Sequence, residues 1–176
     1  MQIHLVMTVI GPDRPGLVES IAGLVSGHGG NWLESRMCRL GGEFAGIVRV
    51  ALSAENKDTF VEALQGLGPD GLKVVVRSDD VGNAPVTQRS LTIDIIGQDQ
   101  PGIVHGISKI LAAHGVNVEE LETECVSAPM SGEPMFKAHA RLQVPQDCDM
   151  THLRSELEKL AGDLFVDLSF EELAGS

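Results

Sequence analysis

Two short loops in the sequence, Gly11–Gly16 and Gly97–Gly102, combine glycine, proline and polar side chains in the same pattern. Each loop leads from an apolar stretch into a segment with helical spacing. Backbone N–H groups and the positive end of a helix therefore face any ligand that binds at the loop. A carboxylate suits such a place, and Asp13 or Asp99 could accept hydrogen bonds from an ammonium group. The sequence therefore predicts binding of a small amino acid at one or both loops. The predicted ligand-contacting loop residues are Gly11, Pro12, Asp13, Arg14 and Gly16 in the first loop and Gln98, Asp99, Gln100 and Gly102 in the second.

An asparagine follows each loop at the same distance along the chain, as Asn31 and Asn117. Each stands at the start of the next expected strand, and its carboxamide can donate and accept hydrogen bonds with a ligand. A structural interpretation is equally open: glycine and proline shape the turn, aspartate caps the helix, and asparagine bonds its own backbone. The two loops differ at their second and fourth positions, so we expect their ligands or affinities to differ.

The loops belong to an internal repeat with a spacing of 86 residues. Nine of the 21 positions from Gly11 to Asn31 are identical to those from Gly97 to Asn117. Later the spacing becomes 92, because the second copy holds six extra residues near 128–133. A polar stretch rich in turn-forming residues separates the copies. We therefore predict two domains with a linker between them, at 1–80, 81–87 and 88–176.

Each copy shows the same order of elements. Apolar stretches that end at glycine, or that alternate with polar residues, predict strands. The expected strands are Gln2–Ile10, Trp32–Leu40, Phe44–Leu52 and Lys73–Arg77 in the first copy and Ser90–Ile96, Val118–Ser127, Phe136–Val144 and Phe165–Leu168 in the second. Apolar residues at helical spacing predict two helices per copy. The first helix of each copy is expected to start near Pro15 or Pro101, with Asp13 or Asp99 as its cap, and to end at a histidine followed by glycine.

The order βαββαβ predicts an α+β, ferredoxin-like fold in each copy, with a four-stranded antiparallel sheet and two helices on one face. The uncovered face of each sheet predicts packing between the domains and, as a weaker corollary, a homodimer. This order, with the Gly11–Gly16 loop after the first strand and Gly29–Asn31 before the second, resembles an ACT domain, the amino-acid-sensing regulatory module. The resemblance implies that the loop and the asparagine position line an effector site.

Further segments are similar to the glycine cleavage system transcriptional repressor family, whose members contain two such domains. The matching segments are Asn31–Arg36 and Leu40–Phe44 in the first copy and Asn117–Thr123 and Ser127–Pro134 in the second. The resemblance implies a non-catalytic regulatory protein that binds glycine or serine and acts through a protein partner, a DNA-binding activator of glycine cleavage genes. The alternative is a regulatory subunit or accessory protein of an amino-acid-metabolising enzyme. We expect no catalytic residues and no cofactor, because the chain lacks a phosphate-binding glycine loop, a nucleophile elbow and an acidic phosphoryl-transfer motif.

The charge balance argues against direct contact with nucleic acid. The net charge is −12 with a pI near 4.8, and such a surface repels the phosphate backbone. The three cysteines are odd in number and lack CxxC spacing, which fits reduced thiols. No apolar run reaches the length of a membrane span, and the N-terminus lacks a basic leader. We therefore expect a cytoplasmic protein without membrane contact.

The histidines and cysteines offer no metal-binding pattern along the sequence. His28 and His114 occupy matching positions at expected helix ends, where the helix dipole alone favours histidine. The other histidines show no short ligand spacing, so we expect no metal site. Cys38 and Cys125, on equivalent strands, are expected to be small buried residues rather than nucleophiles.

Overall fold

The computed structural model describes residues 1–79 and 88–173. The chain divides into two compact units, Met1–Gly82 and Asn83–Ser176. The expected linker at 81–87 lies outside the described residues, so the domain bounds 1–80 and 88–176 stay predictions. Within the described parts, no helix has the length and apolar character needed to cross a membrane.

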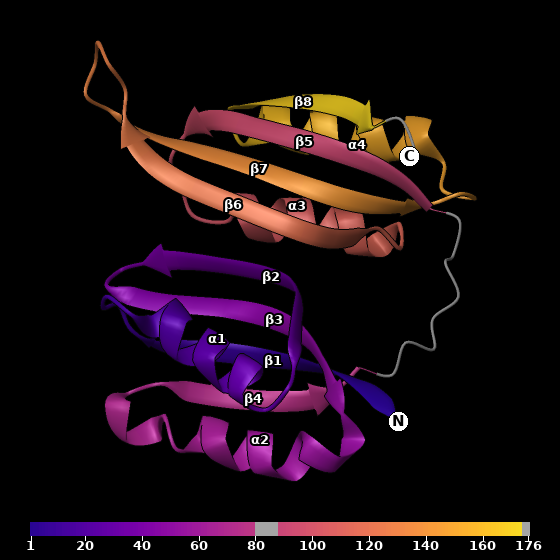
Figure 1. Ribbon diagram of the computed structural model, residues 1–176. Helices are drawn as coiled ribbons and strands as arrows, with labels where there is room; N and C mark the ends of the chain where they lie inside the picture. Colours follow the sequence, from indigo (N-terminus) through magenta and orange to yellow (C-terminus); the bar gives the residue numbers. More distant parts are fainter. Residues whose placement is uncertain (80–87, 174–176) are drawn as a thin grey trace. The chain divides into compact units, whose positions relative to one another are not determined.

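Both units contain four strands and two α-helices in the predicted order (Figure 1). The first unit consists of β1 (Gln2–Pro12), α1 (Leu17–Gly27), β2 (Asn31–Leu40), β3 (Glu43–Ser53), α2 (Lys57–Gln65) and β4 (Lys73–Ser78), with short 3-10 helices η1 (Ala54–Asn56) and η2 (Gly68–Asp70). The second unit consists of β5 (Gln88–Gln98), α3 (Ile103–Ala113), β6 (Asn117–Ser127), β7 (Pro134–Pro145), α4 (Met150–Asp163) and β8 (Val166–Leu173). The sheets have the strand orders β2-β3-β1-β4 and β6-β7-β5-β8, with antiparallel pairing throughout. The predicted α+β, ferredoxin-like class is therefore confirmed.

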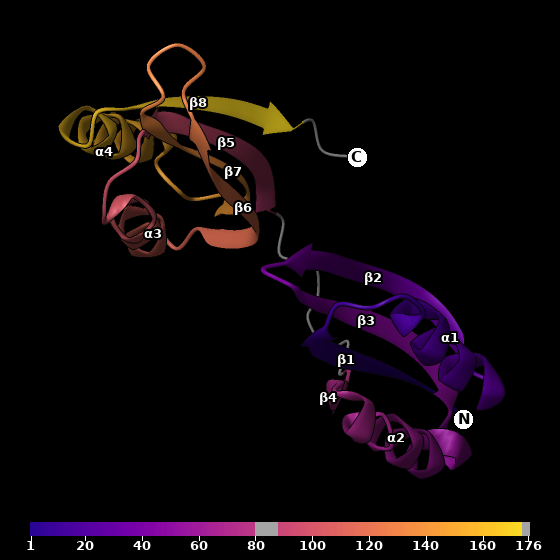
Figure 2. The same ribbon diagram turned by 90° about the vertical axis from the view of Figure 1, so that its left-hand side faces the viewer.

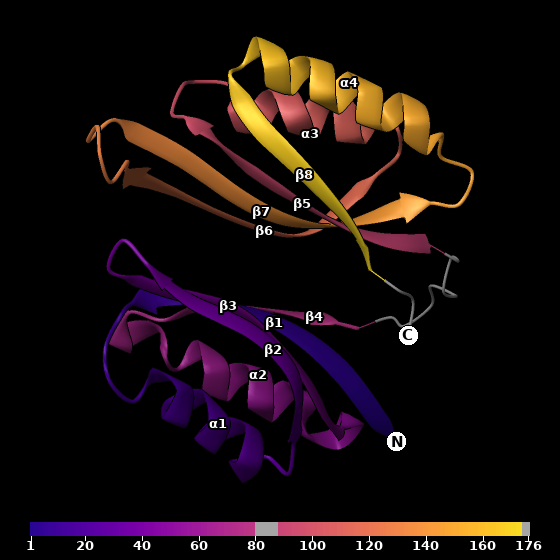
Figure 3. The same ribbon diagram turned by 90° about the horizontal axis from the view of Figure 1, so that it is seen from above.

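The hydrophobic core of each unit lies between the sheet and its two helices, which cover the same sheet face (Figure 3). Alternate residues of the central strands β1 and β5 point into this core, and the helices add apolar residues one turn apart. Buried in the first unit are Leu5, Met7, Val9, Leu17, Ile21, Val25, Phe60 and Leu64. Their counterparts in the second are Leu91, Ile93, Ile95, Ile103, Ile107, Leu111, Leu153 and Leu157. The core is aliphatic apart from Phe60 and Phe136.

The start of the first helix in each unit differs from the expectation. Helices α1 and α3 begin after Gly16 and Gly102, whose φ angles of 87° and 96° place them in the left-handed region that glycine tolerates. Neither helix has a side chain that caps its first turn. The predicted capping by Asp13 and Asp99 is therefore wrong, because the chain needs the glycine conformation to turn from strand to helix.

The helix ends follow the prediction. His28 and His114 occupy the C-cap positions of α1 and α3, and the glycines that follow have φ angles of 66° and 68°. The connection between β6 and β7, residues 128–133, is longer than the two-residue turn between β2 and β3 and extends beyond the sheet (Figure 2). This connection contains the predicted extra residues of the second copy.

Candidate functional site

The Gly11–Gly16 and Gly97–Gly102 loops are held in the same way in both units. The backbone N–H of Asp13 donates to Gly42 O at 2.9 Å, and that of Asp99 donates to Pro134 O at 3.0 Å. Each loop is thus tied to the hairpin connection at the same end of its sheet. This bond fixes the loop above the first turn of α1 or α3.

Each loop begins where the backbone passes very close to the turn before the last strand. A Cβ atom on Gly11 would lie 2.7 Å from Gly71 O, and one on Gly97 would lie 2.7 Å from Phe165 O. Side chains rarely tolerate such distances to backbone atoms, so only glycine fits at either position. Close packing against the backbone alone therefore explains why glycine stands at these two positions.

The two aspartates have different partners at equivalent positions. Asp13 Oδ2 lies 2.6 Å from Arg39 Nε, in an ion pair whose arginine is mostly exposed. Asp99 lies beside Cys125, which stands 86 residues after Arg39. Desolvation, followed by the charge of Asp99 and a hydrogen bond to it, raises the pKa of the Cys125 thiol.

The prediction that Cys38 and Cys125 are buried is wrong, because both lie exposed on their strands, at the sheet edges.

The residues after the aspartates also reach equivalent places. Arg14 Nη2 lies 3.9 Å from Asp70 Oδ2, and Gln100 Nε2 donates to Leu164 O. Both side chains thus connect the loop to the segment before the last strand. The loop positions predicted to touch a ligand therefore include side chains that already brace the loop itself.

The first turns of α1 and α3 offer free donors. The first helical bond of α1 is made by Ser20, whose N–H donates to Gly16 O at 2.9 Å; in α3, Gly106 donates to Gly102 O at 2.8 Å. The N–H groups of residues 17–19 and 103–105 precede these bonds and have no partner within the helix. Because no side chain caps them, they are available to an anion at the loop.

The asparagines lie at the other end of each sheet. Asn31 pairs with Ala51, which pairs with His4 near the start of β1. His4 is seven residues from Gly11, which corresponds to about 23 Å along a strand. Asn117 has the matching place in the second unit, through Gln143 and Ser90. Within one domain the structure therefore does not bring the loop and the asparagine together, because the intervening helix runs back along the sheet.

A second group of polar side chains, which the sequence analysis missed, lies on the open face of the second sheet. It lines a shallow hollow of about 580 Å³ and includes Asp94, Glu122, Glu124, Lys137, His139 and Asp167. His139 Nδ1 lies 2.7 Å from Asp94 Oδ1. These residues come from β5, β6, β7 and β8, so only strand alternation in all four strands together could have predicted the group.

The comparison with known families decides what this repeated arrangement is. The profile of the ACT domain family matches residues 3–70 and 89–171, which is most of each unit. The chain belongs to the ACT domain family. It carries two ACT domains in tandem, as the resemblance implied.

Two relatives match nearly the full length of the chain. The glycine cleavage system transcriptional repressor of Escherichia coli (strain K12) is 27% identical over 168 residues, which are 93% of this chain and 86% of the repressor. A crystal structure of an unknown protein from Galdieria sulphuraria is 30% identical, with a TM-score of 0.89 over 99% of this chain and 100% of that chain. This ACT-domain chain is therefore homologous to the repressor.

An enzyme also contains a related segment. The phosphoserine phosphatase of Mycobacterium tuberculosis is 25% identical over 180 residues, which are 97% of this chain but only 41% of that enzyme. The similarity therefore lies in one part of a longer protein.

Proposed function

We propose that this chain is a regulatory protein that binds a small amino acid at the Gly11–Gly16 or Gly97–Gly102 loop and passes the bound state to a protein partner. The similarity to the repressor carries this proposal, since the match spans 93% of this chain and 86% of the repressor. The partner is a DNA-binding activator, and the regulated genes are those of the glycine cleavage system. The protein acts in the cytoplasm without touching DNA itself.

The loop geometry supports an amino-acid ligand. Free N–H groups at the start of α1 or α3 suit its carboxylate, and an aspartate carboxylate lies in the same loop for its ammonium group. Glycine and serine are the first candidates because the chain is similar to a glycine cleavage system transcriptional repressor. Asn31 and Asn117 stay proposed ligand contacts, but each would serve a molecule other than the one at its own domain's loop.

The test removes one N–H group and leaves the rest of the helix intact. Val18 and Val104 are the second residues of α1 and α3, and both side chains are more than 40% exposed. Proline is tolerated in the first helical turn, where its missing N–H breaks no helical bond. We therefore expect Val18→Pro or Val104→Pro to abolish the ligand-induced rise in melting temperature at the affected loop.

Val18→Ala and Val104→Ala are the matched controls, because they shorten the same side chains but keep the N–H. Ligand at a hundred times its Kd should stabilise the original chain by about 2.7 kcal/mol. Scanning fluorimetry and calorimetry with glycine and serine measure this effect. Equal binding by the proline and alanine variants, or no heat with any common amino acid at millimolar concentration, would contradict the proposed site.

The second candidate function is a regulatory part of an amino-acid-metabolising enzyme, which the related segment of the phosphatase favours. Co-purification distinguishes the two functions. An activator that binds DNA should be retained by the chain in the first case, and a metabolic enzyme whose turnover the chain alters in the second.

A further inference from the structure

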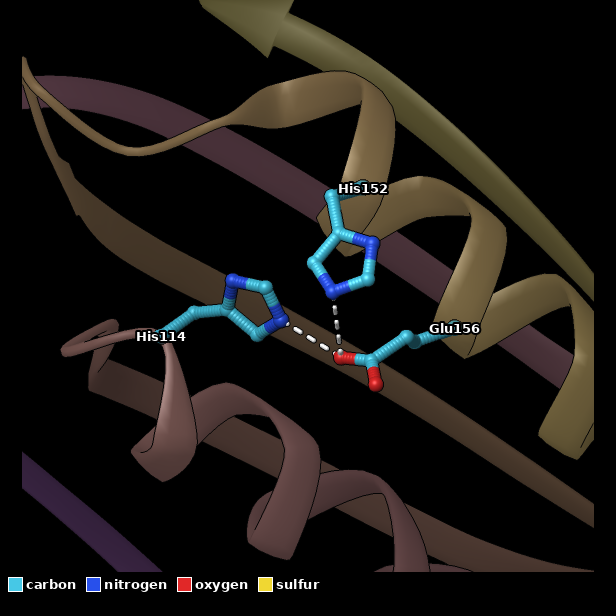
Figure 4. Close-up of side chains that lie close together, drawn as sticks. All are labelled: His114, His152 and Glu156. Carbon is cyan, nitrogen blue, oxygen red and sulfur yellow. Dashed lines mark hydrogen bonds and ion pairs between the residues drawn. The ribbon is translucent and has the colours of Figure 1, made fainter.

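Three side chains meet where the end of α3 lies beside the start of α4 (Figure 4). His114 caps the end of α3, while His152 and Glu156 lie one turn apart on α4. His114 Nε2 is 2.6 Å from Glu156 Oε2, and His152 Nε2 is 3.9 Å from the same oxygen. One potential ligand atom from each residue lies within 4.8 Å of the other two.

The hydrophobic core and the cap of α4 fix the positions of the three side chains. Leu111 of α3 and Leu153 and Leu157 of α4 are buried in the same core cluster, which fixes the two helices against each other. The side chain of Asp149 accepts from the backbone N–H of His152 at 3.0 Å and thereby caps α4. The two α4 residues therefore project from a helix end that is itself well anchored.

The three side chains are unequally exposed, which leaves the group open to solvent. His114 is only 14% exposed, Glu156 is 44% exposed and His152 is 63% exposed. The mostly buried His114 side chain sets the position of the site, and the exposed His152 side chain has room to reorient. An ion from solution can thus approach, and a water molecule can complete its coordination.

Two imidazole nitrogens and one carboxylate oxygen form a ligand set typical of zinc and similar divalent ions. Around a tetrahedral ion with bonds of about 2.1 Å, ligand atoms lie about 3.4 Å apart. The separations of 2.6 Å and 3.9 Å both lie within 1 Å of this spacing. Rotation of the exposed His152 side chain can shorten the 3.9 Å between its Nε2 and Glu156 Oε2 to the spacing of about 3.4 Å.

We propose that His114, His152 and Glu156 bind one divalent transition-metal ion of the zinc class and tie α3 to α4. This inference is independent of the proposed function, because neither loop takes part in it.

The first ACT domain offers a contrast. There His28 Nδ1 lies 2.8 Å from Leu24 O and the imidazole ring packs against Phe60.

The other two proposed ligands, His152 and Glu156, are also replaced in the first domain. Aligning the buried Phe60 and Leu64 with Leu153 and Leu157 gives a spacing of 93 residues. At that spacing, Thr59 and Ala63 stand where the second domain has His152 and Glu156. One ion per chain is therefore the expected stoichiometry.

The test is a calorimetric titration of the full chain with zinc chloride, without any amino acid present. His152→Ala is the main variant, since this exposed side chain contributes little to packing, and Glu156→Gln is the second. We expect each to weaken zinc binding by about tenfold or more. His105→Ala, which removes an exposed histidine elsewhere on α3, is the matched control and should bind like the original chain.

Long-range proton–nitrogen NMR spectra give an independent readout. Zinc should shift the Nε2 resonances of His114 and His152 and leave those of His105 unchanged. Cys148→Ser should keep full binding, because no thiol belongs to the proposed set. Three results would overturn the proposal: no stoichiometric binding, wild-type binding by His152→Ala and Glu156→Gln, or loss of binding in Cys148→Ser.

Discussion

Asp13 and Asp99 occupy equivalent positions, yet one carboxylate pairs with Arg39 and the other lies beside Cys125. His28 and His114 have diverged in a similar way, with a carbonyl and a phenyl ring beside one and a carboxylate and a second imidazole beside the other. In both pairs the backbone position is kept while the side chain's neighbours have changed. The two domains therefore share a scaffold but differ in local chemistry.

His139 predicts a pH dependence of stability in the second domain. The hydrogen bond to Asp94, opposed by desolvation and supported by the charges of Asp94 and Glu122, raises the pKa of His139. The pair stabilises the folded domain fully below the unfolded-state pKa of about 6.5, and this contribution is lost as the pH rises through the higher folded-state pKa. Because both side chains are at least half exposed, we expect a loss of less than about 1 kcal/mol.

Urea unfolding followed by circular dichroism, between about pH 5.5 and pH 8.5, measures this loss. Asp94→Asn should flatten the pH dependence of the second domain. The only tryptophan, Trp32, lies in the first domain, so its fluorescence transition provides an internal control that should not respond to Asp94→Asn. An unchanged pH profile in the variant would rule out this pair as the cause.

At the level of elements, hydrophobic periodicity predicted the strands and helices because each pattern is local. The start of α1 and α3 was mispredicted because a long-range contact engages Asp13 and a glycine conformation turns the chain. The asparagines were placed with the loops because they follow them closely in sequence, although a whole helix separates them in space. The proposed metal ligands lie 38 and 42 residues apart, so they form no short sequence pattern, apart from the helical spacing of His152 and Glu156.

The tight contact between the start of each loop and the turn before the last strand predicts a large effect of one methyl group. Gly11→Ala or Gly97→Ala places a Cβ 2.7 Å from a backbone oxygen, so we expect a loss of about 1–3 kcal/mol in the affected domain. Gly27→Ala and Gly162→Ala are matched controls, because both sites are helical and have nothing within 4 Å. They should be neutral or stabilise by up to about 1 kcal/mol.

Trp32 fluorescence assigns each effect to a domain. Gly11→Ala should lower the urea midpoint of the fluorescence transition, whereas Gly97→Ala should lower only the transition seen by circular dichroism. If alanine at either loop position cost no more than its helical control, the close approach would not constrain these positions.

The open sheet faces differ between the domains at equivalent positions. In the first sheet, Ile47 and Val75 flank Thr8 in one row, and both are more than half exposed. In the second sheet, the corresponding row consists of His139, Asp94 and Ser169. The same fold thus carries an apolar row on the open face of one sheet and a polar row on that of the other. The strand order alone therefore does not determine the chemistry of the open face.

For the whole molecule, charge is the dominant property. Residues 1–86 carry 10 acidic and 7 basic side chains, whereas residues 87–176 carry 15 and 6, so the net charges are −3 and −9. Both halves are acidic, and the second strongly so. A protein partner that meets the second half should therefore present basic residues.

This charge predicts no specific DNA binding by the chain alone. Few basic groups are available to displace counterions from phosphates, so operator DNA of glycine cleavage genes should show no retardation at physiological salt. Fluorescence anisotropy with labelled operator DNA measures this directly. Nanomolar, sequence-specific binding by the isolated chain would contradict both the prediction and the proposed indirect mode of action.

The thiol beside Asp99 makes the second loop experimentally addressable without any engineered residue. Cys125 is exposed and stands where the first domain has Arg39, so a dye attached there would sit next to the loop of the second domain. Its raised pKa means that labelling requires mildly alkaline buffer, and Cys38→Ser would remove the other exposed thiol. The emission of such a dye would report occupancy of one loop in a chain that contains two.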